Sequence, residues 1–360
     1  ATTTPGSGSS RNSRTTAAFM VQTASVTIEN LTIRSTNSVP YGISASSDYV
    51  RISSVNVDGD TGLGGITYLA GISVADWSEV IASSISMGGG SAIRLNGIRS
   101  SISYSTGTNN TGVAALEFWT GASTNTVTGS YFRNGGGDAA YLQTGAHYNT
   151  ISYSTMTTAT PGGFTIFFSG TSSSNTITRS VLSNPTGNGA RFSGSSAYNT
   201  ISFSSVSSHE DNYAALAFGS SWNRVADSHI LGKGYAAYIF NGAEFNTIER
   251  STVTNGGTLN AALYVTGSSN TISESHIGSL SSHALQFTDG AAKNTVSYST
   301  IAASSSGGYA FNVLNCDSNT VTRSVISNPS GHAAHIVGHY TVVDQSSVTS
   351  NAGGYSALYI

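Results

Sequence analysis

Six side chains in the second half of the sequence combine acids, bases and an aromatic ring at a nearly constant spacing. They are Asp227, His229, Arg250, Glu274, His276 and Tyr298. An acid stands two residues before a histidine twice, at Asp227 and again at Glu274. Carboxylates and imidazoles are common general acids and bases, and tyrosine offers an apolar ring with a polar end. We take the six residues as a candidate surface patch for glycans; the simpler interpretation is a solvated surface.

The same residues do not predict a metal site, and no cofactor is expected. In stacked strands His229 and His276 would lie two strands apart, roughly 9.6 Å, which is too far for one metal ion to bind both. The loop at 209–211 (His-Glu-Asp) has no acidic partner nearby, whereas calcium needs six to eight oxygen ligands. We expect a solvated loop there, and we expect neither Lys233 nor Lys293 to lie beside an acidic pair.

An internal repeat predicts the elements that position these residues. A segment N-T-I/V-S/T-x-S-x-I/V recurs at intervals of 23–26 residues, and a second segment, G-x-A-A-L-x-V/F-x-G-S-S, fills the other half of each repeat. The first segment begins at Asn125, Asn149, Asn175, Asn199, Asn223, Asn246, Asn270, Asn294 and Asn319. Weaker copies place the same apolar residue at Ile28, Ile52, Val80, Ile102 and Val343. The repeat therefore fills nearly the whole chain, in about fourteen copies.

Both segments predict short strands, because they are rich in β-branched and aromatic residues and are bounded by Gly, Asn and Ser. A repeat of about 24 residues without a helical pattern buries its apolar face only by stacking on copies of itself. Parallel crossovers are right-handed in nearly all proteins. We predict an all-β fold: a single right-handed parallel β-helix of about fourteen coils over residues 25–360. Residues 1–24 are expected to form an N-terminal arm, with 17–21 as a cap strand.

Stacking turns each repeat position into a column along the rod. The Asn column is expected at a left-handed turn, with its amides bonded to the amides above and below, and it is interpreted as structural. An inward Ser column is expected to form a hydroxyl ladder. Asp227, Arg250 and Glu274 fall in successive coils and are expected to form an ion-pair ladder. His335 and His283 are expected to replace an inward Leu and an inward Ala.

Composition excludes several classes of function. Charged residues make up only 9% of the chain, the net charge is −3, and no basic block could neutralise nucleic acid or an anionic membrane. No run of 18 or more apolar residues is present, so no membrane span is predicted. Cys316 is the single cysteine, which excludes an internal disulfide.

The two repeated segments resemble the parallel β-helix repeats of the pectate-lyase-like superfamily, most closely its NosD-like, generic right-handed β-helix members. The resemblance covers residues 25–360. It implies the fold, and it leaves the function open, because the superfamily includes polysaccharide lyases, hydrolases, epimerases, phage tailspikes, adhesins and structural rods. Only the ladder residues carry over from it.

Acidic residues are too sparse in the outward columns to predict a lyase or glycosidase site. The leading hypothesis is therefore a non-catalytic extracellular or cell-surface rod, fibre- or adhesin-like. Its last residues end within a coil, from which we expect association with itself end to end. The alternative is a carbohydrate-active β-helix: a polysaccharide lyase, an epimerase or a glycan-binding module. A third hypothesis is ice binding by outward Thr pairs such as Thr176 and Thr178, although Arg224 and Glu249 interrupt that array.

Overall fold

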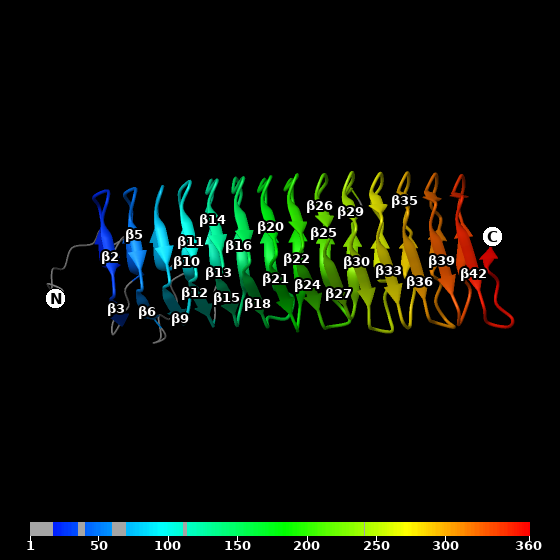
Figure 1. Cartoon of the computed structure of the whole chain (residues 1–360), viewed down its shortest axis with the longest axis horizontal. Helices are drawn as coiled ribbons and strands as arrows, with labels where there is room; N and C mark the ends of the chain where they lie inside the picture. Colours follow the sequence, from blue (N-terminus) through cyan, green and yellow to red (C-terminus); the bar gives the residue numbers. More distant parts are fainter. Residues whose placement is uncertain (1–16, 35–39, 60–69, 111–113, 241) are drawn as a thin grey trace.

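The computed structural model describes residues 17–34, 40–59, 70–110, 114–240 and 242–360. Three parallel sheets wind around one axis, and each coil contributes one strand to each sheet. Every strand pairs with the strand three positions further along the chain, so the coils stack in sequence order from one end of the rod to the other (Figure 1). This is the predicted right-handed parallel β-solenoid of about 14 turns of ~24 residues.

Sheet A has fifteen strands. They are β1 (Ala17–Val21), β4 (Tyr41–Ala45), β7 (Ala70–Val74), β10 (Ser91–Leu95), β13 (Ala114–Phe118), β16 (Asp138–Leu142), β19 (Phe164–Phe168), β22 (Asn188–Phe192), β25 (Ala214–Phe218), β28 (Tyr235–Ile239), β31 (Leu263–Val265), β34 (Leu285–Phe287), β37 (Phe311–Leu314), β40 (Ala334–Val337) and β43 (Leu358–Tyr359).

Sheet B has fourteen strands and contains the first repeated segment. They are β2 (Thr27–Glu29), β5 (Arg51–Ser53), β8 (Glu79–Ile81), β11 (Ser101–Ser103), β14 (Thr126–Thr128), β17 (Thr150–Ser152), β20 (Thr176–Thr178), β23 (Thr200–Ser202), β26 (Arg224–Ala226), β29 (Thr247–Glu249), β32 (Thr271–Ser273), β35 (Thr295–Ser297), β38 (Thr320–Thr322) and β41 (Val342–Asp344).

Sheet C also has fourteen strands, and these contain the last residues of each first repeated segment. They are β3 (Thr32–Arg34), β6 (Asn56–Gly59), β9 (Ser84–Met87), β12 (Thr106–Asn109), β15 (Tyr131–Asn134), β18 (Thr155–Thr158), β21 (Val181–Asn184), β24 (Ser205–Ser208), β27 (His229–Gly232), β30 (Thr252–Asn255), β33 (His276–Ser279), β36 (Thr300–Ala303), β39 (Val325–Asn328) and β42 (Ser347–Ser350).

The segment expected as a cap strand is β1, which pairs in parallel with β4 as the first strand of sheet A. Residues 1–16, the rest of the expected arm, lie outside the described residues. Among the described residues, no helix is long and apolar enough to cross a membrane.

The core fills the interior of the solenoid with stacked apolar side chains. Sheet B contributes one Ile or Val per coil, fully buried in all but the first and last coils, such as Ile201 paired with Val225. Sheet A contributes most of the largest buried side chains, and the rings of Phe168, Phe192 and Phe218 follow one another at 4.8 and 5.4 Å between centroids. Each coil thus covers the apolar face of the next, which a single coil could not bury alone.

The Asn ladder forms the corner between sheets A and B. The backbone N–H of Asn199 donates to Oδ1 of Asn223 at 3.0 Å, and Asn199 Nδ2 donates to the same oxygen at 3.1 Å and to the carbonyl of Ser172 at 2.9 Å. Asn199 is fully buried, so these bonds satisfy groups that water cannot reach. The predicted amide ladder is confirmed.

The left-handed conformation expected of these asparagines belongs instead to the residue before each one. Tyr198 has φ 59° and Trp222 has φ 63°, whereas the ladder asparagines keep negative φ. The prediction was wrong by one position because the asparagine must already lie along the strand to align its amide with the rod axis. The turn therefore falls on its predecessor, whose side chain projects outward.

The corner between sheets B and C contains a second column with positive φ, followed by the Ser ladder. Ser180 N–H donates to Ser204 Oγ at 3.1 Å, and Ser204 Oγ donates to the carbonyl of Ser202 at 2.7 Å. The ladder serines are buried, and each hydroxyl is satisfied by backbone groups of its own and the preceding coil. This confirms the predicted hydroxyl ladder.

Candidate functional site

The six residues of the predicted patch all lie at or beside the corner between sheets B and C. The positive-φ position of successive coils is occupied by Asp227, Arg250, Glu274 and Tyr298. His229 and His276 begin β27 and β33, and Thr252 lies between them in the register of sheet C. The structure therefore brings the six residues to one edge of the solenoid.

The ion pairs at this edge differ from the expected ladder. Arg250 Nε binds Asp227 Oδ1 at 2.8 Å, and Arg250 Nη2 binds Glu249 Oε1 at 2.9 Å. Arg224 also pairs with Glu249. Within the described coils no ion pair joins Glu274 to Arg250, because Glu249, the sequence neighbour of Arg250, supplies the second carboxylate.

These contacts make Asp227 a poor general acid. The hydrogen bond from Arg250 lowers the pKa of Asp227 below its ordinary value. At the far end of the patch, Tyr298 accepts a hydrogen bond from Arg323, whose guanidinium lies 5.5 Å from the centre of the tyrosine ring. Asp227, Arg250 and Tyr298 are therefore surface side chains engaged in contacts with charged neighbours.

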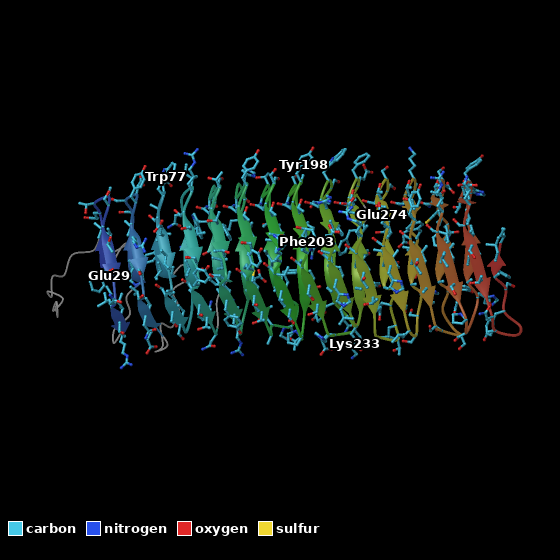
Figure 2. All side chains as sticks on the ribbon, in the orientation of Figure 1. Glu29, Trp77, Tyr198, Phe203, Lys233 and Glu274 are labelled. Atoms are coloured by element: carbon cyan, nitrogen blue, oxygen red, sulfur yellow. The ribbon has the colours of Figure 1, made fainter. Side chains whose placement is uncertain are left out.

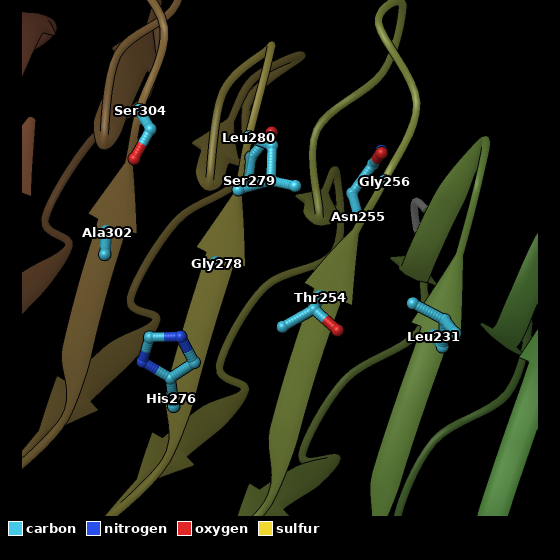
Figure 3. A pocket seen from close by; sticks show the side chains of 10 residues that line it. All are labelled: Leu231, Thr254, Asn255, Gly256, His276, Gly278, Ser279, Leu280, Ala302 and Ser304. Carbon is cyan, nitrogen blue, oxygen red and sulfur yellow. The ribbon is translucent and has the colours of Figure 1, made fainter. Parts of the chain in front are cut away.

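His276 lines a shallow pocket on the outer face of sheet C (Figure 3). The pocket exists because Gly278 has no side chain and the imidazole of His276 lies over it. A Cβ on Gly278 would come within 2.8 Å of His276 Nε2. The other lining residues are Leu231, Thr254, Asn255, Gly256, Ser279, Leu280, Ala302 and Ser304. None of these lining residues has a carboxylate side chain, so the pocket does not supply the acid partner that catalysis by His276 would need.

Lys233 corrects another expectation from the sequence. Its Nζ lies 2.8 Å from Asp211 Oδ2, and the hydrogen bond and charge of Asp211, with the charge of Glu210, raise the pKa of Lys233. Lys233 therefore does lie beside an acidic pair, because the loop after β24 stacks on the turn after β27. Figure 2 places Lys233 on the edge of the rod opposite Trp77 and Tyr198. Lys233 is solvent-exposed and Asp211 is half-buried.

The outer face of sheet A has a different character. In its longer strands the first and fourth residues both point outward, so two columns run side by side along the rod. Phe164 and Phe167 of β19 stack at 4.8 Å, and Phe167 stacks on Tyr141 of the preceding coil at 5.5 Å. These rings are half-buried. They form a first aromatic cluster on the outer face of sheet A.

A second aromatic cluster lies three coils further along. The rings of Tyr235 and Tyr238 are 5.2 Å apart, Tyr238 stacks on Phe240 at 3.9 Å, and Tyr264 meets Tyr238 edge-on at 5.0 Å. Burial, the main cause, raises the pKa of Tyr264 to about 12, so its hydroxyl stays protonated near neutral pH and can donate to Asp289 at 3.4 Å.

One arginine connects the two clusters. Arg191 of β22 has its guanidinium carbon 5.6 Å from the ring centre of Phe164 and 5.4 Å from that of Phe240. The coil between Arg191 and the second cluster, which contains β25, presents the small residues Ala217 and Gly219 to this surface. We call this surface the aromatic platform, defined by Tyr141, Phe164, Phe167, Arg191, Tyr235, Tyr238, Phe240 and Tyr264.

Acidic side chains border the platform on its N-terminal side. Glu117 is buried and its Oε2 accepts from Arg94 Nε at 2.7 Å and from Ser91 Oγ at 2.6 Å, while its Oε1 accepts from Gln143 Nε2 at 2.6 Å. Burial raises the pKa of Asp138 to about 7, against the lowering effect of the hydrogen bond that it accepts from Phe164 N–H at 2.8 Å. Asp138 is thus largely neutral below neutral pH.

Histidines border the platform on its C-terminal side. His335 aligns with Asn312 in an outward column of sheet A and bonds its Oδ1 at 3.0 Å. His283 stacks on Tyr309 at 5.3 Å, and the same tyrosine stacks on His335 at 4.8 Å. The expectation that His335 and His283 point inward was wrong. Large core residues such as Phe311 leave no room inside, so polar rings occupy the outer face.

The platform escaped prediction because its residues fall at the variable positions of the second repeat. In G-x-A-A-L-x-V/F-x-G-S-S the second x is Tyr264 in one coil and Ala217 in another. A motif describes only the residues that recur, so it carries no information about these variable positions. The usable signal is that aromatics fill this x in several coils, as at Tyr141, Phe167 and Tyr238.

Within the described residues, no group of three or more His, Cys, Asp or Glu could hold a metal ion.

Comparison with known proteins identifies the family. The family model of the right-handed β-helix region matches residues 65–225 and 213–359, so the chain belongs to the right-handed β-helix family. No curated protein matches the chain significantly.

Solved structures share the fold at low sequence identity. One is the catalytic domain of a GH87 α-1,3-glucanase in complex with tetrasaccharides (TM-score 0.55, 12% identity, 86% of this chain, 61% of that domain). Another is the tailspike of E. coli bacteriophage HK620 in complex with a pentasaccharide (0.53, 9%, 87% and 66%). A third is a mannuronic acid-specific family 6 lyase from the human gut microbiota (0.53, 11%, 81% and 76%). The chain thus spans about three-fifths of the glucanase domain's length.

Proposed function

We propose that this protein binds a polysaccharide along the outer face of sheet A. The observation that carries the proposal is the aromatic platform, where half-buried rings from four coils lie mostly in two adjacent columns. Aromatic faces pack against the apolar faces of sugars while their polar edges bond hydroxyls. The strands stack about 4.8 Å apart, so a platform spanning several coils suits an extended chain rather than a single sugar.

The structural neighbours support this proposal only through the fold. The glucanase domain and the tailspike were solved with oligosaccharides bound, so right-handed β-helices do hold glycans in those proteins. At 9–12% identity no residue role is transferred from them. The location on sheet A rests on this chain's own side chains.

The competing hypothesis, an extracellular rod that associates with itself, accounts for less of the surface. The Asn and Ser ladders would stiffen a rod, but they would stiffen a glycan-binding solenoid equally. A spacer does not need stacked rings on one face, or a guanidinium there that forms no ion pair among the described residues, and half-exposed aromatic clusters usually mark binding surfaces. A polysaccharide ligand also fits the proposed location outside the cell, which secretion of the natural full-length protein would test.

Binding is proposed here rather than cleavage, because the acids beside the platform are unsuited to act as a pair. Glu117 is held by Arg94, Ser91 and Gln143, so its carboxylate oxygens already have partners. Asp138 is the remaining carboxyl group at that border, and a glycosidase needs two acids facing the same bond.

The test is affinity electrophoresis through gels containing single polysaccharides, both neutral and acidic, with Phe164→Ala/Tyr238→Ala as the platform variant. A matched control is Tyr198→Ala/Trp222→Ala, which removes two stacked aromatics (6.1 Å) from the corner between sheets A and B. We expect the platform variant to lose at least tenfold in affinity and the control to retain wild-type retardation. Circular dichroism confirms that both variants fold.

Two outcomes would contradict the proposal: no retardation of the wild type by any polymer, or equal losses in both variants. Release of oligosaccharides from the retarding polymer would instead show that the protein cleaves its ligand.

A further inference from the structure

We propose that the polysaccharide carries anionic groups and that Arg191 pairs with one of them; this inference rests on the proposed function. The ligand class is an acidic polysaccharide, bearing carboxylate or sulfate groups. Arg191 would then determine which polymers the platform accepts, while the rings on either side provide the sugar contacts.

The position of Arg191 separates it from an ordinary surface arginine. Its side chain leaves β22 and crosses the small residues of β25, with Nε 4.0 Å from where a Cβ on Gly219 would lie. The guanidinium ends between Phe164, one coil back, and Phe240, two coils ahead. The two rings fix its plane and restrict its motion, so little conformational entropy is lost when a ligand binds.

The charge of Arg191 is uncompensated within the part of the chain that the structure describes. Its Nε is buried and has no hydrogen-bond partner there, and no ion pair reaches its guanidinium. The platform's other nearby arginine, Arg94, differs, because its Nε binds the carboxylate of Glu117 at 2.7 Å. A partly desolvated cation without an anion is costly, and an incoming carboxylate or sulfate would pair its charge and accept hydrogen bonds from its terminal Nη groups.

A second arginine supplies the matched control. Arg179, at the corner between sheets B and C, also lies between two rings, 5.5 Å from Tyr153 and 5.4 Å from Phe203. It makes the same cation–π contacts as Arg191 but lies off the platform. If cation–π packing were the only role of Arg191, replacing Arg191 or Arg179 would have the same effect on polysaccharide binding.

The experiment compares matched polymers by isothermal titration calorimetry at low salt: polygalacturonate against its carboxyl-reduced form, and dextran sulfate against dextran. The proteins are wild type, Arg191→Gln, Arg191→Lys and Arg179→Gln. We expect wild type to prefer one acidic polymer over its neutral partner at least tenfold, with a preference that falls as sodium chloride is added. Arg191→Gln should abolish the preference, Arg191→Lys should keep part of it, and Arg179→Gln should keep all of it.

The two matched pairs tell carboxylate from sulfate recognition. Equal binding of acidic and neutral polymers, still lost in the platform variant, would overturn this inference and leave the proposed function standing. A preference that survives Arg191→Gln would overturn it as well. Failure of every polymer to bind wild type would overturn both. If Arg191→Gln does not fold, the salt dependence of the wild type and the Arg191→Lys variant decide the question in the same way.

Discussion

The outer faces of sheets A and B share one frame and differ in nearly everything else. In sheet B, Thr176 aligns with Thr200 and Thr178 with Ser202, and Ser202 Oγ donates to Thr178 Oγ1 at 3.2 Å. Polar groups there bond their equivalents in the next coil. In sheet A, Arg191 aligns with Phe167 on one side and Ala217 on the other. The stacked coils do not cause this difference between the two faces, since the same Asn and Ser ladders support both sheets.

The variable face also carries the less stable arrangements. Arg191 Nε is buried there without a hydrogen-bond partner among the described residues, and Asp138 has a raised pKa. Groups that lower stability persist where another role requires them. On sheet B the outward Thr and Ser side chains bond one another. Ice binding by these Thr pairs stays a prediction. Arg224, aligned with Thr200 and Thr247, interrupts their array.

The largest expected effect comes from breaking the shared frame. Asn199→Ala removes the acceptor of Asn175 N–H and Nδ2 and the donor to the Ser172 carbonyl, all of them buried. Each buried group left unsatisfied costs about 1–3 kcal/mol, so we expect a loss of roughly 3–6 kcal/mol in the free energy of unfolding. Guanidinium denaturation measures it. Thr200→Ala, the next residue on the outer face, is the control and should change stability by less than about 0.5 kcal/mol. Similar losses in both variants would refute the ladder's role.

The second prediction concerns the stability lost at Asp138. Its folded-state pKa of about 7 lies above the ordinary value of 3.8, so the folded protein keeps a proton that the unfolded chain releases. The penalty is absent below about pH 4, grows as the pH rises, and is complete above pH 7. Asp138→Asn cannot ionise. We expect its stability advantage over wild type to grow by up to about 4 kcal/mol between pH 4 and pH 7.5. Melting curves at the two pH values test this; a constant difference would contradict it.

The third prediction uses the histidine border of the platform. His283 Nδ1 accepts the N–H of Tyr309 at 2.9 Å, which requires a neutral ring nitrogen. Burial first, and then the charge of His335, lower the pKa of His283 below its ordinary 6.5. Its contribution is therefore complete above about pH 6.5 and is lost as the pH falls below that value. His283→Asn keeps an acceptor that does not titrate.

We expect wild type to lose about 1–2 kcal/mol more than His283→Asn between pH 7.5 and pH 5, the value of one buried hydrogen bond. Urea denaturation at both pH values provides the comparison. Parallel losses in the two proteins would show that the imidazole does not sense acid in this range.

What the sequence could predict follows the same division between faces. The Asn and Ser ladders recur in most of the coils, so their spacing alone gives the fold, the corners and the inward columns. The platform depends on contacts between coils, such as that of Arg191 with Phe240, and these require the register of sheet A rather than a motif. Lys233 and Asp211 were missed for the same reason. The left-handed turn was misplaced by one residue because local propensity favours Asn there, whereas the ladder requires that Asn in the strand.

The smallest expected effect tests whether the corner between sheets B and C is a second site. Asp227 and Arg250 form an exposed pair, and exposed pairs contribute little because water and salt screen them. We expect Asp227→Asn and Arg250→Gln to leave the melting temperature unchanged within error, in low and high salt alike. Polysaccharide retardation should also stay at the wild-type level, since neither residue touches the platform. A loss of binding in either variant, with the platform variant unaffected, would move the glycan site from sheet A to this corner. The two faces would then exchange roles, and the aromatic rings of sheet A would need another ligand.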